Sequence, residues 1–176
     1  MSGRKRVSRD RAGFTLMEVA LAVIVLLVGL LALSASAVRV QGLARAARER
    51  MAAQNALRAK SEEIRSISRA GLADPLGWGV HVTNALVGLT SFQVEGLTPC
   101  EGQASVGRVA LVRDETASDA ELGVELGLPR DLDGDGLATH SGVAGSARLF
   151  PVVLEVRWTS AWGEQRVVQG LWILGN

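Results

Sequence analysis

The chain has 176 residues, with 19 lysines and arginines against 18 aspartates and glutamates, and a single cysteine. This length suits one small globular domain together with one long helix. One cysteine excludes an intramolecular disulfide, so we expect Cys100 to be a buried or capped thiol, with pairing to another protein as the alternative. The chain contains no nucleophile elbow, Walker loop or zinc-protease motif, and the sequence therefore predicts that it is not an enzyme.

A basic leader precedes an apolar run at the N-terminus. Residues 1–13 carry five basic side chains against one acid, Asp10. Residues 19–38 contain no charged side chain, and twenty helical residues are enough to cross a hydrocarbon layer of about 30 Å. Glu18 lies just inside this run. A carboxylate costs about 2.5–3.5 kcal/mol at the centre of a membrane helix, so we expect Glu18 to have a partner.

The junction between the leader and the apolar run resembles a known processing signal. Gly13, Phe14, Thr15, Leu16 and Glu18 match the N-terminal motif of type IV pilins and of the pseudopilins of type II secretion systems. The resemblance implies that prepilin peptidase cuts between Gly13 and Phe14 on the cytoplasmic face and methylates the new amino group of Phe14.

The same resemblance implies a location and a set of partners. The run 28–33 is more similar to minor pilins and minor pseudopilins than to the major subunits. The chain would then be a single-pass inner-membrane protein with a cytoplasmic N-terminus and a periplasmic head. It would join or prime a type IV pilus or a secretion pseudopilus. Its partners would be other pilin or pseudopilin subunits, prepilin peptidase, an inner-membrane assembly platform and the membrane. The sequence leaves open whether the filament serves as a pilus, in secretion or in DNA uptake.

Two other interpretations of the N-terminus remain open. The sequence Ala35-Ser36-Ala37 offers a cleavage site for a secretory signal peptidase, which would start the mature chain at Val38. Against this, the preceding apolar run is long and carries Glu18, whereas ordinary signal-peptide cores are short and uncharged. A plain single-pass anchor is the other interpretation, and it needs neither cleavage at Gly13 nor an acid at position 18.

Glu18 has a physical role in the assembly hypothesis. Cleavage after Gly13 creates an amino group at Phe14, about one helical turn from Glu18. In a lipid-like filament core, the amine of one subunit and the carboxylate of its neighbour neutralise each other. Opposite charges attract more strongly at low dielectric than in water, and an unpaired charge there is heavily penalised. Glu18 is therefore expected to select one register between subunits.

Residues 39–70 are predicted to continue the helix as a soluble stem, because they lack proline and are rich in helix-forming residues. Gly71 and the following Asp74-Pro75 predict its end. The stem carries an excess of basic side chains and residues 74–176 an excess of acids, which favours either stem-to-head contacts between subunits or simply a solvated helix face. We expect the upper half of a weak apolar stripe to pack on the head, the stripe comprising Leu43, Ala47, Met51, Gln54, Leu57, Ser61, Ile64 and Ile67.

The remaining residues, 71–176, are predicted to form a globular head. The pattern changes to strands after Gly77-Trp78-Gly79, with strands expected over 91–97 and 106–113 and an acidic, mobile segment over 114–121. A C-terminal hairpin is expected to turn at 159–163 and return over 167–174, with one apolar face formed by Phe150, Val152, Leu154, Val156 and Trp158. The prediction is an α+β fold, a long N-terminal helix packed on a small antiparallel sheet. Its parts are a leader (1–13), a transmembrane helix (14–38), the stem (39–70) and the head (71–176).

The head contains a possible calcium-binding loop that begins at Asp131. Asp131, Asp133 and Asp135 alternate ahead of Gly136, which resembles the first half of an EF-hand-type loop. The backbone carbonyl of Leu137 and the side chain of Thr139 are further candidate ligands. The twelfth position is glycine, at Gly142, so a missing ligand would come from elsewhere, or the segment is an ordinary turn. His140 is expected to be a surface residue, because calcium prefers oxygen.

Two classes of function follow from these patterns. The first is an assembly protein, a minor pilin or pseudopilin subunit. The second is a non-polymerising, anchored periplasmic binding module whose acidic head captures cations or a partner. The basic stem lacks interleaved aromatic residues, so no nucleic-acid partner is predicted.

Overall fold

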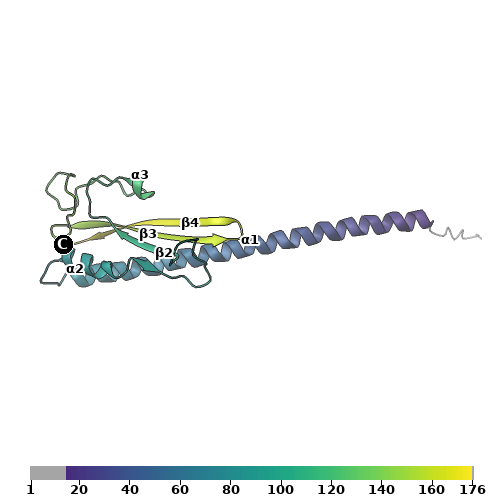
Figure 1. The fold of residues 1–176 in the computed structure, drawn as a ribbon, viewed down its shortest axis with the longest axis horizontal. Helices are drawn as coiled ribbons and strands as arrows, with labels where there is room; N and C mark the ends of the chain where they lie inside the picture. The colour runs from purple at the N-terminus through teal and green to yellow at the C-terminus, as the bar shows by residue number, and fades with distance from the viewer. Residues whose placement is uncertain (1–14, 176) are drawn as a thin grey trace, which may run out of the picture. The chain divides into compact units, whose positions relative to one another are not determined.

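The computed structural model describes residues 15–175, and the chain divides into two compact units, the first ending at Ala44 and the second beginning at Arg45. The N-terminal helix α1 contributes residues to both units (Figure 1). The cleavage site predicted between Gly13 and Phe14 lies outside the described residues. The elements, in chain order, are α1 (Leu16–Gly71), α2 (Trp78–Val87), β1 (Ser91–Phe92), β2 (Gly107–Leu111), α3 (Asp119–Leu122), β3 (Leu149–Ser160) and β4 (Gly163–Leu174).

In the first unit, α1 presents its apolar residues outward. Every residue from 15 to 41 is exposed, including all of the leucines and valines. Among residues 15–175, α1 is the one helix with a stretch long and apolar enough to cross a membrane, and none of that stretch is buried. The predicted long helix is therefore present, and its first part has the composition of a membrane-spanning segment.

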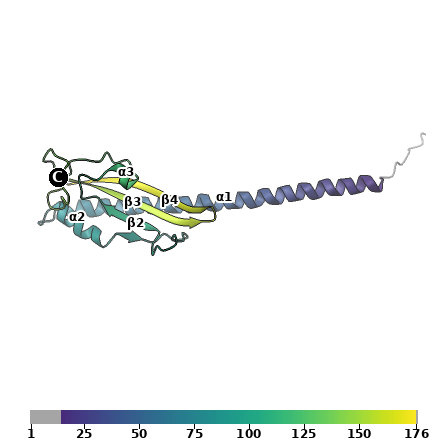
Figure 2. The ribbon, with the colours of Figure 1, turned by 45° about the horizontal axis from the view of Figure 1, so that its top comes forward.

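The second unit has its main core between α1 and the sheet. The buried residues of α1 recur at three- and four-residue steps and end at the last turn: Ala53, Leu57, Ser61, Ile64, Ser68 and Gly71. They pack against the face of β3 that holds Phe150, Val152, Leu154, Val156 and Trp158, all of which are buried as predicted. Figures 1 and 2 show the β3–β4 hairpin along this part of α1.

The expectation that the upper half of the apolar stripe packs on the head is confirmed. Leu57, Ser61 and Ile64 are buried, whereas Leu43 and Met51 are exposed. The lower buried position is Ala53 instead. A hydrophobic stripe is buried only where another element lies opposite, and the sheet begins to cover α1 above residue 50.

The sheet confirms the predicted α+β fold. Its four strands are antiparallel in the order β1-β2-β3-β4. The C-terminal hairpin is longer than predicted, with Ser160 paired to Gly163 around a two-residue turn, Ala161–Trp162. The expected strand over 91–97 is wrong beyond Phe92, because the chain turns where the Leu97 N–H donates to the Val94 carbonyl. The strand expected over 106–113 is present as the shorter β2, at 107–111.

Helix α2 lies between Gly77 and the first expected strand, in a segment for which the sequence predicted no helix. Trp78, Val82 and Leu86 are buried at four-residue spacing, so a helical period covers the core better than an alternating one. Trp78 stacks on Phe150 with ring centroids 5.4 Å apart, and its Nε1 donates to the Ser68 carbonyl at 3.1 Å. A Cβ atom at Gly79 would lie 2.3 Å from the Ala144 carbonyl oxygen, so only glycine fits there.

A second, smaller core covers the other face of the sheet. Val153 of β3 packs there with Val112, Leu126 and Leu128 from the segment after β2. The acidic segment 114–121, expected to be mobile, is instead part of this folded layer. It contains the fully buried Glu115 and the start of α3, whose Ser118 and Glu121 form a reciprocal capping box. Cys100 is a buried free thiol, as expected.

Candidate functional site

The described part of the chain contains two predicted functional features, the single residue Glu18 and the acidic loop. The first is Glu18. It lies in the first turn of α1, and its side chain is exposed. The Glu18 N–H donates to the carbonyl of Thr15 at 3.0 Å and to Thr15 Oγ1 at 3.3 Å. Thr15 therefore caps the helix, and an acid three residues later is favourable beside the positive end of the helix dipole. This local role is compatible with a pairing role between subunits.

The second group is the acidic loop, which the structure folds as a cluster. The carboxylate oxygens of Asp131, Asp133 and Asp135 lie within 4.8 Å of one another. Asp131 accepts hydrogen bonds from the N–H groups of Gly134 and Gly136. Gly134 and Gly136 both have positive φ, 85° and 91°, which lets the chain wrap around that carboxylate.

The other two aspartates are also held in place. Asp133 accepts from the N–H of Asp135 at 3.2 Å and from Ser146 Oγ at 3.2 Å. Asp135 accepts from the Leu137 N–H at 2.8 Å. The Thr139 N–H donates to Glu115 at 3.2 Å. The Leu137 carbonyl and the Thr139 hydroxyl stay predicted ligands.

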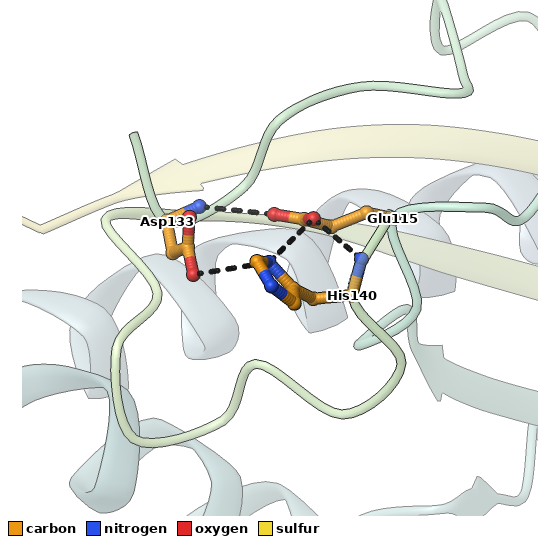
Figure 3. Close-up of side chains that lie close together, drawn as sticks. All are labelled: Glu115, Asp133 and His140. Atoms are coloured by element: carbon orange, nitrogen blue, oxygen red, sulfur yellow. Dashed lines mark hydrogen bonds and ion pairs between the residues drawn. The ribbon is translucent and has the colours of Figure 1, made fainter. Parts of the chain in front are cut away.

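Glu115 is the central residue of the site, and the sequence reasoning missed it. Its side chain is 0% exposed. One carboxylate oxygen accepts from the N–H groups of Leu132 (2.8 Å) and Asp133 (3.3 Å), and the other accepts from those of Thr139 (3.2 Å) and His140 (3.0 Å). Glu115 therefore fastens both ends of the loop 132–140 to the segment that follows β2 (Figure 3).

His140 lies closer to the acids than expected. Its side chain is half exposed, in agreement with a surface position. Its Nδ1 is nevertheless 3.5 Å from Glu115 Oε2, 3.5 Å from Asp135 Oδ2 and 3.8 Å from Asp133 Oδ2. Figure 3 shows the imidazole facing Glu115 and Asp133. Glu115, Asp133 and His140 form a second group whose ligand atoms lie within 4.8 Å of one another.

Hydrogen bonding sets the charge state of the buried carboxylate. Burial raises the pKa of Glu115, but the four backbone N–H bonds lower it by more, so the pKa lies below its ordinary value of 4.5. Backbone bonds from Gly134 and Gly136 likewise hold the pKa of Asp131 below its ordinary value. At neutral pH the loop therefore keeps ionised carboxylates close together.

This arrangement determines which ions fit the site. Asp131, Asp133 and Asp135 offer the oxygen ligands that calcium prefers, and Glu115, Asp133 and His140 offer the mixed nitrogen and oxygen set of a transition metal. Glu115 already accepts two hydrogen bonds on each oxygen, so it is less available as a ligand than the three aspartates. The aspartate set is the better fit.

Sequence spacing predicted the aspartate cluster because its three members lie within five residues. Nothing in the sequence distinguished Glu115 from the neighbouring surface acids of the segment 114–121. Its partners are 17 to 25 residues away and are backbone groups, which carry no sequence signal.

Comparison of the chain with family models, curated proteins and solved structures finds no match. The structure itself defines an α+β protein with a long, partly apolar N-terminal helix and an organised acidic loop.

Proposed function

We propose that this chain is a minor pilin or minor pseudopilin, an anchored subunit that joins or primes a filament built from related subunits. The single observation that carries the proposal is the motif that includes Gly13, Phe14 and Glu18, which lies at the start of an exposed apolar helix. A processing signal at this position frees an amine next to an acid that lipid would penalise.

The exposure of α1 supports this proposal. The apolar side chains of residues 16–40 are uncovered within the protein itself, and burying each one fully would stabilise the protein by about 1.5–3 kcal/mol. Lipid covers such a helix in a membrane, and neighbouring helices cover it in a filament. A subunit that moves between these two environments needs this composition.

The N-terminus of the mature protein is the first test. Intact mass and N-terminal peptide mass spectrometry of the membrane fraction should give a chain that begins at a methylated Phe14. A start at Val38 would support the secretory signal peptide, and an uncleaved chain would support the plain anchor.

The Glu18→Ala variant is the second test. Removing the acid makes insertion easier and also removes the partner for the Phe14 amine of a neighbour, so membrane association should persist while co-purification with other subunits falls. Glu101→Ala, at an exposed acid in the head, is the matched control. Undiminished co-assembly of Glu18→Ala would contradict the pairing role of Glu18, and a wild type that co-purifies with no other subunit would favour the non-polymerising binding module.

A further inference from the structure

One tryptophan of this protein is placed unlike the other three. Trp162 lies in the two-residue turn between β3 and β4 and is 62% exposed. Trp78 and Trp158 are buried in the main core, and Trp172 is partly buried, with the Arg130 guanidinium 5.2 Å from its ring centroid. The sequence contains no tyrosine, so tryptophan is its one side chain type that joins a large apolar ring to a polar hydrogen-bond donor.

Contacts to α1 show at which end of the second unit this turn lies. Trp158 Nε1 donates to Glu49 Oε2 at 3.3 Å, and Ser160 also hydrogen-bonds the Glu49 side chain. At the opposite end of the hairpin, Ser68 Oγ donates to the Leu174 carbonyl. Strand β3 therefore runs antiparallel to α1 and β4 runs parallel to it, and the turn between them lies beyond Glu49 toward Arg45, where the second unit begins (Figure 1).

Covalent connectivity limits the distance between this turn and the apolar run. Arg45 follows Arg39, the first charged residue after the uncharged stretch, by six residues. Six residues extend by about 9 Å as a helix and by about 20 Å at most. The interfacial layer beyond the hydrocarbon is about 5–8 Å deep on each side. Whatever the arrangement of the two units, Arg45 therefore stays within about 20 Å of the edge of a hydrocarbon layer that holds residues 19–38, and the turn lies at the Arg45 end of the second unit.

Charge and size favour lipid over protein as the contact. The chain between the apolar run and the hairpin contact carries Arg39, Arg45, Arg48 and Arg50 against Glu49, a net positive charge that attracts anionic headgroups. The neighbours of Trp162 in the turn are small, Ala161 and Gly163. One aromatic side chain falls far short of the roughly 800 Å² per partner of a stable protein interface, whereas single tryptophans are common at the membrane surface.

We infer that Trp162 is a membrane-interface anchor, and that the β3–β4 turn lies in the headgroup layer while residues 19–38 span the bilayer. This inference rests on the membrane insertion in the proposed function, and it adds a second contact between the protein and the membrane. The hairpin is fastened to Glu49, so the anchor limits how far the second unit can tilt away from the surface.

Fluorescence quenching by lipid tests this contact. The full chain is reconstituted in vesicles of phosphatidylcholine and phosphatidylglycerol that contain lipid brominated near the headgroup end of its acyl chain. We expect the wild-type emission to be quenched and most of this quenching to be lost in Trp162→Phe. Trp172→Phe is the matched control, and it should retain the quenching because Trp172 lies in the folded sheet.

Flotation of the same vesicles separates the two hypotheses. If wild type and Trp162→Phe both float and show equal quenching, the anchor is overturned and membrane insertion stands. If the wild type does not float, both fail. Trp162 emission that brominated lipid does not quench, and that shifts only as the protein-to-lipid ratio rises, would assign Trp162 to a contact with a second copy and would also overturn the inference.

Discussion

The two parts of α1 show how one helix can satisfy opposite requirements. Up to residue 41 every side chain is exposed, although most are apolar, whereas from Ala53 onward one narrow stripe is buried under the sheet. The second part depends on contacts within the protein, and the first part depends on whatever surrounds it. The helix also holds an acid in each part, since Glu18 is exposed in the first and Glu49 accepts a hydrogen bond from Trp158 in the second.

The first prediction compares one substitution in each part of α1. Ile64→Ala removes a fully buried side chain and should lower the free energy of unfolding by about 2–5 kcal/mol. Leu31→Ala, at a position 70% exposed, should change it by less than about 0.5 kcal/mol. Denaturant unfolding of the full chain in detergent measures both. Equal effects would mean that the two parts of α1 are packed alike.

The second prediction concerns the buried acid of the second unit. Glu115→Ala leaves four backbone N–H groups without their acceptor and should destabilise the protein by about 2–3 kcal/mol. Glu101→Ala, at an exposed position, should stay within about 0.5 kcal/mol of wild type. A stability of Glu115→Ala like that of the control would show that water replaces the carboxylate without cost.

The third prediction is that the acidic loop of the second unit binds calcium weakly. The glycine at the twelfth loop position predicts a weak site, with a Kd of about 10⁻⁴–10⁻³ M. Millimolar calcium should then stabilise the folded chain by about 0.4–1.4 kcal/mol, seen as a higher melting temperature than in chelator. Asp133→Ala should abolish this difference. Identical melting curves for the wild type with and without calcium would make the loop an ordinary turn.

The smallest effect is expected where the hairpin meets α1. Hydrogen bonds from Ser160, Trp158 and Arg45 hold the pKa of Glu49 below its ordinary value of 4.5. The folded protein therefore binds fewer protons than the unfolded chain, and this contribution to stability is full above pH 4.5 and is lost as the pH falls. Glu49→Gln should show a smaller fall in melting temperature between about pH 6 and about pH 3.5. A fall equal to that of wild type would exclude Glu49 as a contributor.

The amino-acid pattern was enough to predict the long helix, the C-terminal hairpin and the clustering of three aspartates. Each of these depends on local signals: a run without proline, apolar alternation along β3, and acids spaced two residues apart. The cleavage between Gly13 and Phe14 and the pairing role of Glu18 remain predictions from the same N-terminal motif.

Three features became visible only in the folded chain: where the buried part of the α1 stripe begins, the helix over 78–87, and the role of Glu115 in organising the acidic loop. These outcomes depend on partners far away in the chain. Ala53 is buried and Met51 exposed because of where the sheet lies, and Glu115 ionises in a buried site because backbone N–H groups 17 to 25 residues away converge on it. Backbone donors are identical in every residue, so no sequence pattern reveals them before the chain folds.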